Sequence, residues 1–211
     1  MSMDDATSDR ISTEALVLRI SPCRENGAVV SCLSPQLGRM AFYLPDGAGR
    51  RRASAIHCDL FQVLQLQCQP SARPDDDDFY RIGEAELVDD FSAIATDYAA
   101  YQATCWLGAF ALRNAQPRLP MPRFFEAMKI GLRRLCLHEA GPDAVLTGTG
   151  LVFLYEGGWL NTSSMSPQEV SQCELLINMA LELAPAPALS EDLWKRLWEW
   201  TQGRLIECLP D

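Results

Sequence analysis

Residues 12–45 have the sequence STEALVLRISPCRENGAVVSCLSPQLGRMAFYLP, and their pattern indicates the fold of the N-terminal half. Apolar residues alternate with their neighbours along 12–20 and 39–44, and a short run centred on two valines occupies 28–33. A period of two is typical of a strand that buries one face. Turn-forming Gly, Pro, Asn and Ser separate these segments, so the stretch predicts three consecutive strands.

Two more extended segments follow, at residues 60–68 and 79–88. The connection between the third and fourth strands is longer than the others. Five short strands with such a connection form the outline of an OB-type barrel.

Beyond Asp90 the apolar period changes to that of a helix. Ser92 is a candidate cap for a first helix that stops before Pro117, and Pro122 is a candidate first-turn residue of a second. The apolar stripe expected on the first helix consists of Ile94, Tyr98, Tyr101, Cys105, Trp106, Ala109 and Leu112. The stripe expected on the second consists of Phe124, Phe125, Met128, Leu132, Leu135 and Cys136.

The last seventy residues predict two further helices after an irregular Gly-rich stretch at 141–158. Ser166-Pro-Gln-Glu169 has the spacing of a capping box, and Ser190 is a candidate cap for the final helix. In that final helix we expect Leu193, Trp194, Leu197 and Trp198 to face inward.

The chain is therefore predicted to be an α+β protein with an N-terminal five-stranded OB-fold β-barrel and an all-α helical domain. We expect a flexible acidic tail over residues 1–10, the OB-fold domain over 11–90 and the helical domain over 91–211.

Composition excludes several classes of protein. The 211 residues are 48% hydrophobic and 22% charged, which excludes wholesale disorder. No apolar run approaches the roughly 18 residues of a membrane helix. The acidic start has neither a basic nor an apolar region of the kind found in secretory signals, so we expect a cytoplasmic protein without membrane contact.

The potential metal and catalytic residues are scattered. Eight cysteines are spread almost evenly among apolar neighbours, as expected of free thiols in a core. Only two histidines, His57 and His138, are present, and no paired-ligand spacing suggests zinc. Neither histidine has a Ser or Cys neighbour suited to catalysis, so we expect no enzymatic activity, no cofactor and no small-molecule substrate.

The net charge of −10 conceals a basic segment. Between Arg10 and Ala72 there are seven arginines and four acidic residues, whereas the acidic residues are concentrated in the N-terminal tail, at Asp75 to Asp78 and in the later helices. Four consecutive carboxylates on a Pro-flanked loop favour a solvated hairpin tip over a metal site.

Four motifs stand in the basic half of the chain: a first strand at 13–19, Glu25 in the first turn, the Ser34-Pro-Gln-Leu-Gly38-Arg39 turn, and the Gly-, Ala- and Arg-rich residues 47–54 ahead of Leu60-Phe61. Together they resemble the opening of the bacterial recombination-repair family RecO. The resemblance covers residues 12–90. Beyond them only the helical architecture is shared. This chain lacks the four-cysteine zinc module of many members and their basic character.

The resemblance implies a non-enzymatic mediator. Such a protein binds single- and double-stranded DNA, anneals strands, and with RecR loads RecA onto strands coated by single-strand-binding protein. The expected DNA-binding residues are Arg19, Arg24, Arg39, Tyr43, Arg50, Arg51 and Arg52.

Each expected site has a simpler alternative. Arg50 to Arg52 suit phosphate because guanidinium donates bidentately, but they are equally a solvated loop. Tyr43 is expected beside Arg39 on an outer strand face, where it could stack on a base or cover a seam with the helical domain. The cluster of Trp194, Trp198 and Trp200 predicts core packing, or else a groove for a partner's peptide. A second hypothesis for the whole chain is an OB-fold adaptor that has lost DNA binding and docks on RecR or on the acidic tail of single-strand-binding protein.

Overall fold

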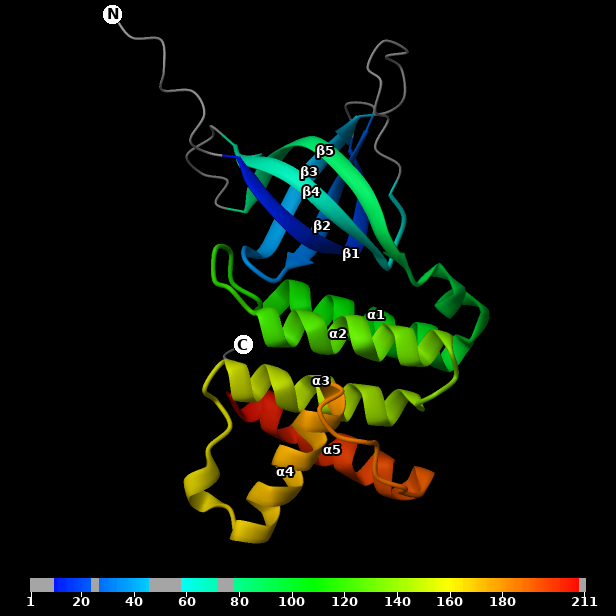
Figure 1. Cartoon of the computed structure of the whole chain (residues 1–211), viewed down its shortest axis with the longest axis vertical. Coiled ribbons are helices and arrows are strands. Elements are labelled where there is room, and N and C mark those ends of the chain that lie inside the picture. Colours follow the sequence, from blue (N-terminus) through cyan, green and yellow to red (C-terminus); the bar gives the residue numbers. More distant parts are fainter. Residues whose placement is uncertain (1–9, 24–26, 46–57, 72–77, 209–211) are drawn as a thin grey trace, which may run out of the picture. The chain divides into compact units, whose positions relative to one another are not determined.

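A computed structural model describes residues 10–23, 27–45, 58–71 and 78–208 (Figure 1). Five strands form a closed barrel in the order β1-β2-β3-β5-β4. Their bounds are β1 (Ile11–Cys23), β2 (Gly27–Ser34), β3 (Gly38–Pro45), β4 (Gln62–Pro70) and β5 (Phe79–Asp90). The predicted OB-type barrel followed by helices is confirmed.

The barrel closes because β1 pairs with two strands and β5 joins β3. Strand β1 is antiparallel to β2 along one half and to β4 along the other, with a bulge between Val17 and Arg19. Strand β5 pairs antiparallel with β4, and its first residues pair parallel with β3 through Ala41 and Phe42. A bulge of this kind increases local twist, which helps a small sheet to close.

In β3 and β4 the alternating residues that predicted the strands fill the barrel, whereas in β1 the interior residues are Ala15 and Val17, and Leu16 and Leu18 are buried outside this cluster. The buried cluster inside it consists of Ala15, Val17, Val30, Cys32, Met40, Phe42, Leu64, Leu66, Cys68 and Tyr80. Because each strand contributes alternate side chains to the interior, the opposite set faces outward.

The chain divides into two compact units, and the division falls within a helix. Unit 1 comprises residues 1–92 and 108–121, and unit 2 comprises residues 93–107 and 122–211. Residues 108–121, called the returning segment here because they rejoin the barrel strands in unit 1, contact the β2–β3 turn through two backbone hydrogen bonds. Arg118 N–H donates to the Leu37 carbonyl at 2.7 Å, and Met121 N–H donates to the Pro35 carbonyl at 3.1 Å.

Five α-helices and two short 3₁₀ turns follow the barrel in the described chain (Figure 1). They are η1 (Ser92–Thr96), α1 (Tyr98–Asn114), α2 (Pro122–Cys136), α3 (Pro142–Glu156), η2 (Thr162–Ser164), α4 (Pro167–Ala180) and α5 (Glu191–Cys208). The Ser166 capping box is present with both of its hydrogen bonds, and the Ser190 hydroxyl accepts from Leu193 N–H at 3.3 Å. Both predicted caps are confirmed.

The prediction of an irregular stretch at 141–158 was wrong, because most of it forms α3. Residues 144–154 of this helix are all buried. A helix that is apolar or small all round has no amphipathic period, so it gives no periodic signal. Its glycines serve close packing instead: a Cβ on Gly148 would lie 2.9 Å from the Ala180 Cβ, and one on Gly150 would lie 3.0 Å from the Thr201 methyl.

The stripe predicted for the first helix was correct only in part, since Ile94 and Leu112 are buried and Trp106 is half-buried. Tyr98, Tyr101, Cys105 and Ala109 are exposed. Other buried residues of the helix lie outside the predicted stripe: Ala100, Ala103, Thr104, Leu107, Phe110 and Ala111.

The start of that helix and one residue of the last helix also differ from expectation. The side chain that caps α1 is Asp97, which accepts from Ala100 N–H at 3.0 Å, whereas Ser92 begins η1. Of the residues expected to face inward on α5, Trp194, Leu197 and Trp198 are half-buried, but Leu193 is 40% exposed.

Candidate nucleic-acid interface

The candidate interface is the outer face of β1, β2 and β3, where the register brings two of the predicted residues together. One row across these strands is Arg19, Ser31 and Ala41, and the next is Ser21, Val29 and Tyr43. Neighbouring strands lie about 4.8 Å apart and successive residues about 3.4 Å, which places the backbones of Arg19 and Tyr43 about 12 Å apart on one face. Arg24 and Arg50 to Arg52 lie outside the described residues.

Tyr43 lies at the end of β3 that pairs with the start of β2. Its side chain faces out, whereas Met40 and Phe42 are fully buried, so the predicted alternation is confirmed. The phenol ring lies against Gly27, where an added Cβ would be 2.6 Å from the hydroxyl oxygen. Gly27 therefore lets an aromatic ring with 40% exposure rest on the sheet surface.

Arg19 occupies the same face next to the β1 bulge and is exposed. A guanidinium carries its charge at all accessible pH values and matches the geometry of phosphate. An arginine and an aromatic ring on one strand face are the components with which OB folds bind single strands.

Arg39 faces the same side of β3, but unit 1 itself engages its guanidinium. Its Nε donates to Asp78 Oδ2 at 3.2 Å and its Nη1 to the Leu112 carbonyl at 3.1 Å. Through these bonds β3 contacts both Asp78, which directly precedes β5, and the end of α1. Two of the five N–H donors are thereby occupied, so a phosphate would have to share Arg39 with Asp78 or displace it.

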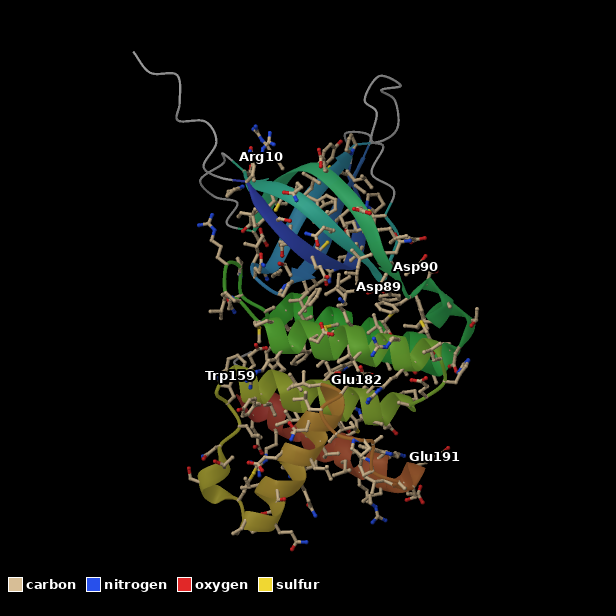
Figure 2. The ribbon with its side chains drawn as sticks, in the orientation of Figure 1. Arg10, Asp89, Asp90, Trp159, Glu182 and Glu191 are labelled. Carbon is tan, nitrogen blue, oxygen red and sulfur yellow. The ribbon has the colours of Figure 1, made fainter. Side chains whose placement is uncertain are left out.

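The β5 side of the barrel has the opposite character. Along β5, Glu84, Glu86 and Asp90 are exposed and Asp89 is half-buried, and Figure 2 shows the last two at the end of the strand. Asp90 accepts from Ser92 N–H at 2.9 Å, and this bond is the main cause that lowers the pKa of its carboxyl group. This side would repel a phosphate backbone, so the arginine-bearing face is the favourable one.

The described residues of unit 1 carry six arginines and seven carboxylates in total. Among these described residues the charges nearly balance, so the capacity of this part of the barrel to bind an anion depends on how the charges are arranged.

Arg118 is a cation near the barrel that the sequence-based prediction missed. It belongs to the returning segment of unit 1 and adopts a left-handed backbone with φ 60°. Burial raises the pKa of the Tyr80 phenol, and a hydrogen bond with Arg118 opposes that rise. No local motif marks this residue, because its place depends on the chain returning to the barrel after α1.

Cys23, Cys32, Cys58, Cys68, Cys105 and Cys173 form no disulfide. Among the described residues no group of three or more His, Cys, Asp or Glu side chains could hold a metal ion. Burial raises the pKa of the Cys68 thiol to about 11. Cys32, Cys68 and Cys173 are buried, while Cys23 and Cys105 are exposed. The prediction that the cysteines are buried in a core is therefore confirmed for only some of them.

The described helices include none that combines the length and the apolar character needed to span a membrane.

Comparisons with known proteins assign no relative. The sequence matches no protein-family model, and a search of curated proteins finds no significant match.

Proposed function

We propose that the chain is a RecO-like mediator that binds DNA without acting as an enzyme. The observation that carries the proposal is a closed OB-type barrel that presents Arg19 and Tyr43 on one outer face beside the β1–β2 turn. OB folds bind oligonucleotides on the face of their second and third strands, flanked by the β1–β2 and β4–β5 loops.

The proposed binding combines two physical contributions. Stacking of a base on Tyr43 would contribute about 1–3 kcal/mol and would tolerate any sequence. Arg19, with the predicted residues Arg24, Arg50, Arg51 and Arg52, would neutralise phosphates and release their counterions. Because neither contribution reads base edges, the protein would bind single strands with little sequence preference.

Annealing of strands, pairing with RecR and loading of RecA onto DNA covered by single-strand-binding protein are the wider parts of this proposal. They rest on the resemblance of residues 12–90. A protein that anneals strands must hold DNA without enclosing the base edges, and binding on an outer strand face would leave those edges open.

The alternative function is an OB-fold adaptor without DNA binding. The near balance of arginines and carboxylates among the described residues of unit 1, and the engagement of Arg39 by Asp78, favour this alternative. The adaptor would use the same barrel for protein contacts, and its binding would depend much less on salt.

The two functions separate in a titration of a labelled poly-dT strand at several salt concentrations, read by fluorescence anisotropy. The mediator is expected to bind at micromolar concentration or tighter, with an affinity that falls as salt rises. Changing Arg50, Arg51 and Arg52 to Ala should lower the salt slope by roughly two, since each phosphate contact on a single strand contributes about 0.7.

The matched control removes three cations from unit 2: Arg123, Lys195 and Arg196, all exposed. It changes the net charge equally and should leave the slope nearly unchanged. Absence of binding by the wild type at low salt would refute the mediator and leave the adaptor.

A further inference from the structure

Unit 2 contains a groove of about 1010 Å³ that the proposed DNA-binding face does not involve. Helices α1, α2, α3 and α5 and the α4–α5 connection all contribute to its lining. The lining includes the small residues Ala103, Gly131 and Gly148. The two glycines allow the helices around the groove to pack closely, since an added Cβ on Gly131 would lie 2.7 Å from Val145.

Three tryptophans supply the aromatic surface of this groove: Trp106, Trp194 and Trp198. Trp106 and Trp198 meet edge to face, with ring centroids 4.8 Å apart. The three rings come from two helices that are distant in the sequence. Tryptophan is the best aromatic partner for a cation, and large aromatic surfaces are common where proteins bind apolar segments.

The charged residues of the groove are mostly acidic. Its lining includes Glu139, Asp143 and Glu191 but only one cation, Arg134. That cation is engaged within unit 2: Arg134 Nη1 donates to the Met179 carbonyl at 3.1 Å, and Nη2 lies 3.7 Å from Glu182 Oε1, a carboxylate that Arg133 also binds. The lining therefore holds three carboxylates against one arginine.

The helix termini reduce this negative charge without cancelling it. Helices α3 and α5 both begin at the same end of unit 2, where Asp143 and Glu191 lie in their first turns (Figure 1). Figure 2 shows Glu191 at this end. Each helix N-terminus contributes about half a positive charge, so, with Arg134 counted, roughly one net negative charge is left in the lining.

We propose that this groove docks an apolar segment of a partner protein that carries lysine or arginine side chains. The apolar side chains of the segment would pack on the tryptophans and small residues, and its cations would lie among the carboxylates and over the indole rings. An amphipathic helix with a basic face has this chemistry. An acidic segment would meet like charge at Glu139, Asp143 and Glu191.

The test uses two fluorescein-labelled peptides of 14 residues, each an amphipathic helix of leucines with either lysines or glutamates on its polar face. Anisotropy is measured with the full chain at moderate salt. The leucine–lysine peptide is expected to bind at least tenfold more tightly than the leucine–glutamate peptide. The double variant E139K/E191K should weaken binding of the basic peptide at least tenfold.

The control variant E126K/E199K has the same net charge but changes exposed residues of α2 and α5 outside the lining. It should change the affinity less than twofold, which separates docking in the groove from general attraction to an acidic protein. A second variant, A99W, fills the groove from an exposed position on α1 and should also abolish binding.

Three results would overturn the proposal: preference for the acidic peptide, no binding of either peptide, or equal loss in the two charge variants. None of these results depends on DNA. The groove and the DNA-binding face can therefore each fail alone.

Discussion

Replacement of Gly38 by alanine should destabilise unit 1 by about 3 kcal/mol. Gly38 has φ 64°, and a Cβ there would lie 2.2 Å from the Gln116 carbonyl oxygen and 2.5 Å from that of Leu119. The left-handed backbone costs a residue with a Cβ about 1–2 kcal/mol. Moving the two oxygens away also breaks the bond from Arg39 N–H to the Gln116 carbonyl, which contributes about 1 kcal/mol.

Unfolding of the G38A variant is followed in urea by far-UV circular dichroism, with hydrogen exchange to locate the change. Faster exchange is expected along 35–45 and 115–121, because the substitution separates the β2–β3 turn from the returning segment. The matched control is G83A on β5, where the nearest atom to an added Cβ is 3.5 Å away and the change should cost less than 1 kcal/mol. Equal stability of G38A and wild type would refute the described packing of residues 108–121 in unit 1.

Four further outcomes follow from the described contacts. The F42A variant empties part of the barrel core and should lose about 3–5 kcal/mol in urea unfolding, and a loss below 1 kcal/mol would contradict its burial. The S166A variant removes the capping box of α4 and should cost about 1 kcal/mol, seen as faster exchange in the first turn of that helix. Burial raises the pKa of Cys68 to about 11, so iodoacetamide at pH 8 should modify the exposed Cys105 well before Cys68. Mass spectrometry of digests gives the order of modification, and the reverse order would contradict a closed barrel. The pKa of Asp90 is lower in the folded than in the unfolded protein, so ionised Asp90 stabilises the fold. The wild type should therefore be more stable than D90N above the unfolded pKa of about 4, and this difference should be lost as pH falls through the lower folded pKa. Urea unfolding of both proteins at pH 7 and pH 2.5 measures the difference in the free energy of unfolding.

The barrel could be predicted from the sequence because its strands are half-buried. Residues such as Met40 and Phe42 alternate with outward residues, and this period of two survives in the linear sequence. The capping box at Ser166 is equally local, since all its partners lie within three residues.

The missed features depend on contacts between residues far apart in the chain. Helix α3 is buried on all sides, so no period distinguishes it from a Gly-rich loop. The sequence predicted Arg39 to bind DNA and gave no sign of its partner, because Asp78 lies 39 positions away. Asp78 also belongs to a run of carboxylates for which the sequence predicted only a solvated hairpin tip. No pattern in residues 108–121 indicates that they return to the barrel.

For the tryptophans of the last helix, the local pattern predicted the burial of some residues but not of all. Their helical spacing predicted a packed face, and Trp194 and Trp198 are indeed half-buried. Trp200 is instead 38% exposed, with the Arg204 guanidinium 5.5 Å from its ring centroid. Trp106 completes the aromatic lining of the groove from α1, and its pairing with Trp198 could not be inferred from spacing.

The most direct test of the central claim compares DNA binding by two arginine variants of the barrel. Arg19 and Arg81 are both exposed strand residues, but Arg19 shares its face with Tyr43 whereas Arg81 lies on β5 among carboxylates. At low salt, R19A is expected to weaken binding of a labelled poly-dT strand about three- to tenfold, and R19A/Y43A by a further tenfold or more. The R81A variant should change it less than twofold. If R81A weakened binding as much as R19A, or if neither did, the β1–β3 face would not be the DNA-binding surface.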